Sequence, residues 1–223
     1  IRKAIMLDPV NPQLLNNMGR VLQSMKQYDS ARVYIQKAIS VDPENAVLLM
    51  RLADVFKQQK RPDSAAHYFK RQFAINAVSN SAPTYQSIGS FFAEMKMPDS
   101  AVIYYKKAIS ADPAYITAYI NAGNTYMELE ENDSALVYLR HAVDINPDNF
   151  IAVYNLGLVY HVMNIYDSAI VYIQQAIRME PARGETYYQL ACTYALHNKP
   201  EQAILYLRQA YERGYKNKES LLT

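Results

Sequence analysis

The side chains that could bind a metal ion or act as a nucleophile include four histidines and one cysteine, namely His67, His141, His161, His197 and Cys192. Metal ligands from one helix must share a face, which places them three or four residues apart. His197 follows Cys192 by five residues and therefore lies on a different side of a helix. A single thiol can form neither an internal disulfide nor a zinc site built from cysteines. The sequence predicts no metal site.

A second candidate for chemistry is the dipeptide Asp-Ser, which recurs at Asp29, Asp63, Asp99, Asp133 and Asp167. Catalytic groups are normally unique in a chain, whereas these pairs stand at one repeated place before an amphipathic run. Asp and Ser are common capping residues at helix starts, and a carboxylate in the first turn complements the helix dipole. The chain has no glycine-rich phosphate loop and no nucleophile elbow. We therefore expect no enzymatic activity and no cofactor, and we interpret the pairs as residues that cap helices and keep the surface soluble.

The charge balance argues against two classes of partner. Lys and Arg number 23 and Asp and Glu 21, which gives a formal net charge of +2. A general nucleic-acid or membrane-surface binder would have a strongly basic face. No apolar run approaches the roughly 20 residues that cross a bilayer, so we expect no direct membrane insertion of this segment. Both a cytoplasmic and a periplasmic location remain open.

Internal repetition dominates the sequence. A proline ends a similar segment at Pro113, Pro147 and Pro181, which are each 34 residues apart, and Pro9 and Pro43 have the same spacing. The interval from 43 to 113 has two extra residues, which we assign to the segment Val78–Pro83. A fixed period of this length is typical of solenoids built from repeated helical pairs.

Each repeat reads as two helices joined by a short turn. Small residues recur on the first helix at Gly19, Ala53, Gly89, Gly123, Gly157 and Ala191, and alanines recur on the second at Ala31, Ala65, Ala101, Ala135, Ala169 and Ala203. We expect Gly19 and Ala31 to let the two backbones approach closely. Tyrosines recur at Tyr34, Tyr68, Tyr104, Tyr138, Tyr172 and Tyr206, and we interpret them as packing between neighbouring repeats.

The pattern resembles the tetratricopeptide repeat family over essentially the whole chain. In one repeat its marks stand at Tyr119, Ala122, Gly123, Tyr126, Ala135, Leu139, Ala142 and Pro147. The resemblance implies an all-α, right-handed superhelical solenoid of antiparallel helix pairs. We place six repeats at 12–45, 46–81, 82–115, 116–149, 150–183 and 184–217. Residues 1–9 read as the second helix of a preceding repeat and 218–223 as the start of a further or capping helix with Asn217 as its N-cap, so we expect a longer polypeptide.

Such a fold implies a binding groove lined by the first helix of each repeat. Its places are the second, fifth, sixth, ninth, twelfth and thirteenth residues of each repeat. The candidates for a peptide-binding groove are Asn17, Arg20, Arg51, Asn121, Asn124, Tyr154, Asn155, Leu158, Tyr188 and Gln189. An amide side chain both donates and accepts hydrogen bonds, so a row of amides suits the backbone of an extended peptide. At Asn17, Asn121 and Asn155 the row resembles the asparagine ladder of the repeat domains of O-linked N-acetylglucosamine transferases. Amides that cap neighbouring repeats, or that are simply solvated, would give the same pattern.

These observations favour a protein-interaction scaffold that binds an extended segment of a partner. An alternative is an accessory substrate-recognition arm of a larger enzyme, such as a glycosyltransferase. The late repeats place Ile120, Tyr154, Leu158 and Tyr188 in the groove, and such an apolar end suits either a second contact, including self-association, or cover by a following helix. The set of Lys, Asn and Arg residues that clamps a partner's terminal carboxylate in some family members is absent from any three adjacent repeats.

Overall fold

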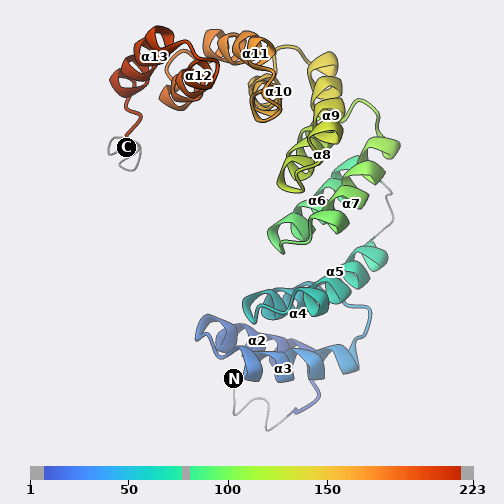
Figure 1. The fold of residues 1–223 in the computed structure, drawn as a ribbon. Helices are drawn as coiled ribbons and strands as arrows, with labels where there is room; N and C mark the ends of the chain where they lie inside the picture. The colour runs from blue at the N-terminus through green and yellow to red at the C-terminus, as the bar shows by residue number, and fades with distance from the viewer. Residues whose placement is uncertain (1–7, 77–80, 217–223) are drawn as a thin grey trace. The chain divides into compact units, whose positions relative to one another are not determined.

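The computed structural model describes residues 8–76 and 81–216, which form twelve α-helices (Figure 1). The helices are α2 (Pro12–Ser24), α3 (Tyr28–Val41), α4 (Ala46–Gln58), α5 (Pro62–Asn76), α6 (Ala82–Glu94), α7 (Pro98–Ala111), α8 (Ile116–Glu128), α9 (Asn132–Ile145), α10 (Phe150–Val162), α11 (Tyr166–Met179), α12 (Gly184–Leu196) and α13 (Pro200–Glu212). The predicted all-α fold is confirmed. Three predicted parts lie wholly or partly outside the described residues: the helix at 218–223 with its Asn217 cap, nearly all of the helix at 1–9, and half of the segment Val78–Pro83.

The helices group into two compact bodies, which are considered separately below. The N-terminal body takes in the described residues up to 76 and the segment Glu94–Lys96, and it holds α2 to α5. The C-terminal body comprises Ser81–Ala93 and the described residues from Met97 onward.

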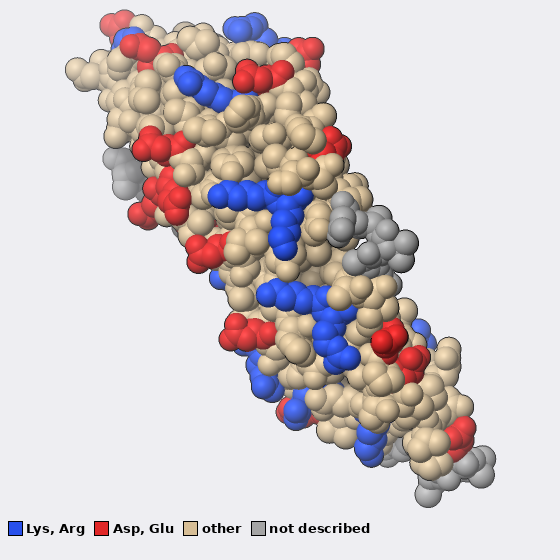
Figure 2. All heavy atoms as spheres, turned by 90° about the vertical axis from the view of Figure 1, so that its right-hand side faces the viewer, with Lys and Arg blue, Asp and Glu red and all other residues tan. Residues whose placement is uncertain are grey.

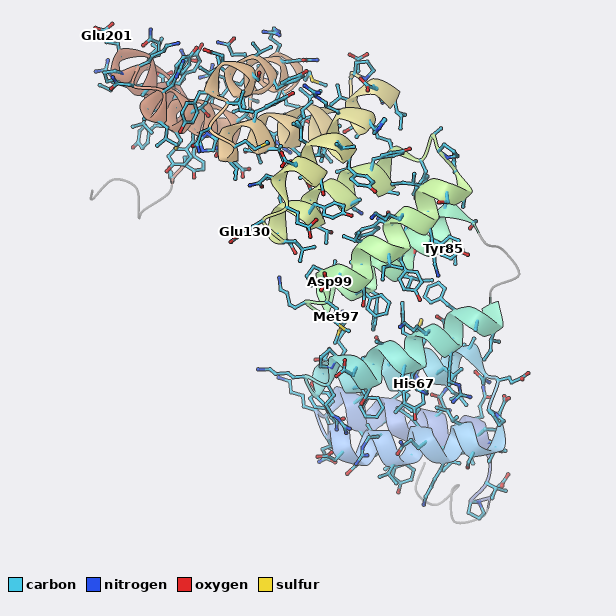
Figure 3. All side chains as sticks on the ribbon, turned by 45° about the vertical axis from the view of Figure 1, so that its right-hand side comes forward. His67, Tyr85, Met97, Asp99, Glu130 and Glu201 are labelled. Carbon is cyan, nitrogen blue, oxygen red and sulfur yellow. The ribbon has the colours of Figure 1, made fainter. Side chains whose placement is uncertain are left out.

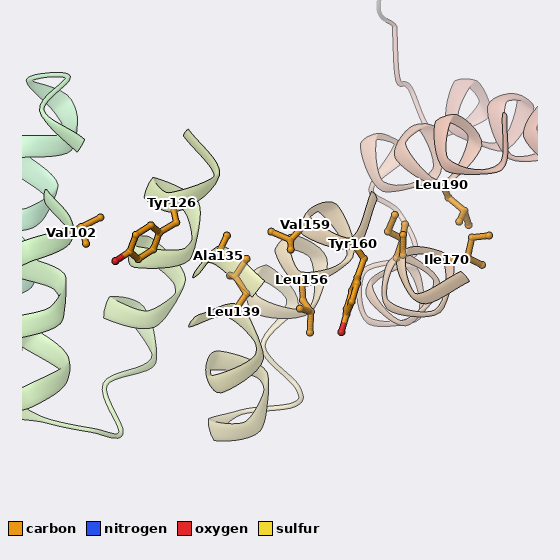
Figure 4. Packing of buried hydrophobic residues seen from close by; sticks show 11 residues of the cluster. Val102, Tyr126, Ala135, Leu139, Leu156, Val159, Tyr160, Ile170 and Leu190 are labelled. Atoms are coloured by element: carbon orange, nitrogen blue, oxygen red, sulfur yellow. The ribbon is translucent and has the colours of Figure 1, made fainter. Parts of the chain in front are cut away.

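Helices of the C-terminal body pack as stacked pairs. In this body α10 contacts α11 of its own pair and α9 of the preceding pair, and α12 contacts α13 and α11 in the same way. The first helix of each of these pairs thus lies between the second helix of its own pair and the second helix of the preceding pair. The first helices α8 and α10 are also in contact. A single pair could not bury its apolar stripe alone, so each pair depends on its neighbours. One buried cluster links several pairs, from Val102 on α7 to Leu190 on α12 (Figure 4).

The close approach within a pair centres on the recurrent small residue. A Cβ atom added to Gly123 would lie 2.6 Å from Leu139 Cγ, and one added to Gly157 would lie 2.8 Å from Ile173 Cγ1. The sequence-based pairing of Gly19 with Ala31 was incomplete, because the atom nearest to that added Cβ is Ile35 Cγ1 at 2.5 Å, with the Ala31 carbonyl oxygen at 3.5 Å. The glycine makes room for the branched side chain one helical turn beyond the recurrent alanine.

The recurrent second-helix tyrosines stack mainly inside their own repeat, which corrects the expectation of contacts between repeats. Tyr138 stacks on Tyr126 with ring centroids 5.3 Å apart, and Tyr172 stacks on Tyr160 at 5.6 Å. Equivalent stacks join Phe56 with Tyr68, Phe92 with Tyr104, and Tyr194 with Tyr206. Sequence spacing could not distinguish these partners, because the two ring positions recur with the same period.

Long polar side chains on the second helices make contacts between repeats. Arg140 donates hydrogen bonds from Nε and Nη2 to the Tyr160 hydroxyl of the next repeat at 3.0 and 2.6 Å. Lys106 lies over the Tyr126 ring at 5.6 Å, and its hydrogen bond to that tyrosine raises the pKa of the lysine. Gln174 Nε2 donates to the Tyr194 hydroxyl at 3.2 Å. These donors therefore hold successive repeats of the C-terminal body together.

The helix starts differ from the capping interpretation. The aspartates of the Asp-Ser pairs lie in the first turn of the second helices, where a carboxylate stabilises the positive end of the helix dipole. They are not the N-cap residues, and the N-caps of these four helices make no side-chain cap hydrogen bond. Side-chain capping occurs instead on first helices, where Asn11, Asn45 and Asn149 accept backbone N–H groups. Capping by the Asp-Ser pairs was thus a wrong prediction.

Each turn between the two helices of a pair contains a residue with left-handed backbone conformation. These residues are Lys26, Lys60, Lys96, Glu130, Asn164 and Asn198, with φ between 56° and 61°. Glu130 stands at the turn between α8 and α9 (Figure 3). The conformation disfavours side chains other than Gly and, to a lesser degree, Asn.

Replacing Gly123 by alanine should lower the free energy of unfolding by about 1–3 kcal/mol, because the added methyl group overpacks the contact with Leu139. In a Leu139→Ala background the same change should cost at least about 1 kcal/mol less, since the methyl group then has space. Chemical denaturation of the four proteins measures this coupling. Strictly additive effects would contradict the proposed contact.

Replacing Glu130 by asparagine should stabilise the protein by a fraction of the roughly 1–2 kcal/mol that a left-handed conformation costs a residue with a Cβ. The reverse change, Asn198→Glu, should destabilise it, because Asn198 has the same conformation in the last described turn. Thermal unfolding should show a higher melting temperature for Glu130→Asn and a lower one for Asn198→Glu. Shifts in the same direction would show that turn conformation does not control the effect.

Candidate functional site

The predicted groove residues lie on first helices of both bodies. In the N-terminal body Asn17 and Arg20 stand on α2, and Arg51 on α4. The C-terminal body carries the other seven, which are Asn121 and Asn124 on α8, Tyr154, Asn155 and Leu158 on α10, and Tyr188 and Gln189 on α12. The second set can be analysed as one surface because all three helices belong to one body.

The outward stripes of these three helices form the surface that we call the first-helix face. On α10 the stripe consists of Ile151, Asn155, Leu158 and Val162, spaced by four, three and four residues. The spacing puts them on one side of a helix. Ile151 and Val162 are 53% and 49% exposed, and the two middle residues are partly buried. The matching residues are Thr117, Asn121, Asn124 and Glu128 on α8, and Glu185, Gln189, Cys192 and Leu196 on α12.

Two predicted residues of this face are joined directly. Asn155 Nδ2 donates a hydrogen bond to Asn124 Oδ1 at 2.8 Å, which connects the first helices of successive repeats. The bond uses one N–H of Asn155 and one lone pair of Asn124. Each amide group retains further donor and acceptor capacity, because an amide offers two N–H groups and a carbonyl oxygen with two lone pairs.

Asn121 and Gln189 stand at the same place of their repeats as Asn155. Within the described part of the chain, neither side-chain amide is hydrogen-bonded to another side chain. Asn121 and Gln189 each accept, through the backbone carbonyl, a hydrogen bond from a threonine hydroxyl four residues later, at 2.8 Å. Both residues are partly buried. Their side-chain amides therefore differ from that of Asn155, whose orientation the neighbouring repeat fixes.

The apolar members of the predicted groove serve packing to a greater extent than the sequence indicated. Tyr154 stacks on Phe150 with centroids 5.6 Å apart, and burial, assisted by the negative charge of Glu185, raises the pKa of Tyr154 to about 12. Tyr188 stacks on Tyr215 at 4.4 Å. Ile120 is only 7% exposed and packs with Ala142 and Ala152. The exposed large apolar residues of the face are thus Ile151 and Val162 at the ends of the α10 stripe and Leu196 on α12, which is 59% exposed.

Arg51 in the N-terminal body has a constrained guanidinium. Its Nε is buried without a hydrogen-bond partner among the described residues. Asp54 lies nearby, and burial raises the pKa of its carboxyl although the charges of Lys57 and Arg51 act in the opposite direction. Arg20 is exposed, whereas Asn17 is partly buried.

Two histidines make contacts that the linear spacing did not reveal. Thr193 Oγ1 donates to the Gln189 carbonyl at 2.8 Å, so its 2.9 Å contact with His161 Nδ1 requires the ring nitrogen to be the donor. Burial lowers the pKa of His161, which favours the neutral imidazole, here with its proton on Nδ1. His197 Nε2 lies 3.1 Å from Asp167 Oδ1. Both contacts join residues about one repeat apart, so a search for ligands along a single helix could not find them.

The last helix pair exposes apolar side chains that are buried in earlier repeats. Ile170 is 9% exposed and Ile173 fully buried, whereas the equivalent residues Ile204 and Leu207 are 54% and 42% exposed. Together with Tyr188, Ala191, Cys192, Ala195 and Ala203 they line a pocket of about 220 Å³ between α12 and α13.

The described ranges contain neither a group of side chains suited to a metal ion nor a helix suited to cross a membrane. No three His, Cys, Asp or Glu side chains in residues 8–76 and 81–216 are grouped so that they could hold a metal ion. None of the described helices has the length and apolarity that a membrane crossing requires.

Similar solved structures share the helical-pair fold. MamA is 25% identical, with a TM-score of 0.63, and the match covers 73% of this chain and 94% of MamA. A tetratricopeptide repeat protein from Parabacteroides merdae is 15% identical, with a TM-score of 0.68, over 92% of this chain and 81% of that protein. YrrB, described as a TPR protein with an unusual peptide-binding site, is 21% identical with a TM-score of 0.61, over 84% of this chain and 95% of YrrB. No curated protein sequence matches the chain at a significant level.

Family models give the same result from the sequence side. Models of the tetratricopeptide repeat match residues 12–45, 82–115, 152–183 and 184–213, and a further TPR repeat model matches 123–164. These ranges together cover well over half of the chain. Stacked helix pairs, recurrent small residues at the close contacts and these matches lead to one conclusion: the chain belongs to the tetratricopeptide repeat family.

Proposed function

We propose that the chain is a protein-interaction scaffold that binds an extended segment of a partner protein on the first-helix face of its C-terminal body. The observation that carries the proposal is the row of amides at the sixth place of three successive repeats, formed by Asn121, Asn155 and Gln189. Their side chains are partly buried, which leaves polar atoms at the surface while restricting their motion. Restricted side chains lose less conformational entropy on binding.

The spacing of the helices suits an extended peptide. Packed helices lie about 8–10 Å apart, and an extended chain advances about 3.3 Å per residue. The first helices α8 and α10 are in contact, so Asn121 and Asn155 can meet the peptide backbone about three residues apart. An amide pairs with backbone N–H and C=O groups regardless of the partner's side chains. The contact between Asn155 and Asn124 orients one amide of the row in advance.

Side chains around the amides give the surface some selectivity. Ile151, Leu158 and Val162 on α10 offer apolar contacts beside Asn155. Glu128 and Glu185 are exposed on the flanking helices α8 and α12. These neighbours favour a segment with an apolar residue near its centre and basic residues toward its ends. The structural likeness to YrrB supports the proposal only in that this fold can carry a peptide-binding site.

The proposal is tested on a partner captured with the intact protein from its own cells and mapped by crosslinking. The double variant Asn121→Ala and Asn155→Ala should bind the mapped segment about 10- to 100-fold more weakly, because two hydrogen bonds of roughly 0.5–1.5 kcal/mol each are lost. Isothermal titration calorimetry measures the change. Gln202→Ala is the matched control, because it removes an exposed amide from the second helix α13. Unchanged affinity in a double variant that remains folded would refute the first-helix face as the binding surface.

A second candidate is self-association through the last helix pair, favoured by the exposure of Ile204 and Leu207. In earlier repeats the next pair buries these places, so a second copy of the chain could bury them here. Sedimentation should then show a concentration-dependent dimer that Ile204→Glu abolishes. Val171→Glu is the control, because Val171 is equally exposed but lies on α11 away from the end pocket. A monomer at all concentrations would exclude this candidate.

A further inference from the structure

One junction between helix pairs departs from the repeat in its chemistry. The twenty-first residue of the repeats is Ala66, Val102, Leu136, Ile170 and Ile204, but Arg32 in the first repeat. The twenty-second residue is Val33, Ile103, Val137, Val171 and Leu205, but His67 in the second repeat. The twenty-first place packs against the next pair in other repeats, as the 7% and 9% exposures of Val102 and Ile170 show, whereas apolar residues at the twenty-second place, such as Val33 and Ile103, are 44% and 54% exposed.

Both exceptions line the same pocket of the N-terminal body. The pocket lies between α3 and α5 and has a volume of about 450 Å³. Its lining consists of Arg32, Gln36, Phe56, Arg61, Asp63, Ser64, His67 and Tyr68. His67 stands on α5 (Figure 3) and packs edge-on against Tyr68 at 5.0 Å. Two substitutions at separate places of the repeat therefore meet at one site.

Arg32 is, with Arg51, one of two arginines of this body whose buried donor is unsatisfied among the described residues. Its Nε is buried and has no hydrogen-bond partner among the described residues. Its Nη2 approaches Asp29 Oδ1 only to 3.9 Å, and that carboxylate is 89% exposed. A buried donor without an acceptor costs about 1–3 kcal/mol, more for a charged group. Valine, the residue at the same place of the third repeat, would avoid this cost.

A second guanidinium completes the site. Arg61 lies over the Phe56 ring with Cζ 5.0 Å from the centroid, and the ring holds the guanidinium at the pocket wall. The first turn of α5, a fifteen-residue helix, also contributes Ser64 and the positive end of the helix dipole. Asp63 is the opposing charge in the lining, but an acid at this place recurs in every repeat, as at Asp99 and Asp133. The guanidiniums and the imidazole are the features specific to this junction.

Equivalent junctions in the C-terminal body fill the same space differently. There a long donor on the second helix reaches a tyrosine hydroxyl of the next repeat, as Arg140 does with Tyr160. At the first junction the residue in the place of that tyrosine is Phe56, which has no hydroxyl, and Gln36 takes the place of the donor. Figure 2 shows Lys and Arg side chains in separate groups along one face of the molecule, with Asp and Glu side chains between and beside them. The pocket is distinguished by the types and arrangement of its lining side chains.

We infer that this pocket is a binding site for a phosphate-type oxyanion, held by Arg32 and Arg61 with His67 and Gln36 as further donors. Guanidinium groups match the geometry of phosphate oxygens and form charge-assisted hydrogen bonds with them. The bound oxyanion accepts the hydrogen bond of Arg32 Nε, which has no acceptor among the residues that the structure describes. The source of the group is either a free phosphate compound or a phosphorylated side chain of a partner.

The test is a titration of the full ¹⁵N-labelled chain with inorganic phosphate at constant ionic strength, followed through the arginine Nε–H signals. We expect the Arg32 signal to move in a saturable manner with a dissociation constant of about 1 mM or tighter. Arg32→Val should weaken binding at least tenfold and keep the fold, because it restores the residue type of the third repeat. His67→Val is a second variant that should weaken it by a smaller factor.

Arg208→Val is the matched control, because Arg208 is an exposed arginine on α13 outside the pocket. A linear response without saturation, or equal binding by wild-type protein and Arg32→Val, would overturn the proposal. An equal response to chloride would overturn it as well. A phosphoserine peptide that binds tenfold more tightly than inorganic phosphate would support the site and identify a phosphorylated partner, whereas equal affinity would support a site for free phosphate compounds.

Discussion

The close contact between a small residue on the first helix and a large side chain on the second is the constraint on which the repeat depends. Where Leu139 rests on Gly123 and Ile173 on Gly157, no room remains even for a methyl group. This contact brings the two helices of a pair together and commits one side of each first helix to packing. The opposite side is left to solvent, which is why the outward stripe of α10 can carry Ile151 and Val162 in exposed positions.

Packing and binding are therefore divided between two sets of places in each repeat. The place of Ala135 is alanine in all six repeats, the place of Leu139 always holds a large apolar residue, and both of these residues are fully buried. Places that vary from repeat to repeat are the ones at the surface, and there the chain offers an amide row on the first helices and a basic pocket between α3 and α5. Variation at a place that the fold requires to be apolar, as at Arg32, is informative because it carries an energetic cost.

The helical fold and its period could be predicted from sequence because the small residues and prolines recur at fixed offsets. The partners of individual residues could not, since every place recurs with the same period. The Tyr138 ring was expected at a contact between repeats but stacks on Tyr126 of its own repeat. Asp29 lies in the first turn, as its effect on the helix dipole led us to expect, but the helix has no side-chain cap hydrogen bond. In the candidate site the sequence selected Asn124 and Asn155, but only the structure shows that they bond to each other. It missed the pocket of Arg32 and His67, whose residues lie on helices of different repeats.

The central claim is that the amides of the first-helix face meet the backbone of a bound segment. NMR signals of the side-chain NH₂ groups of Asn121, Asn155 and Gln189 report this directly when the mapped segment of a captured partner is added to labelled protein. The account predicts that these signals shift together at one stoichiometric equivalent, while the signal of Gln202 on α13 stays in place. Movement of the Gln202 signal with the three face signals unchanged would contradict it.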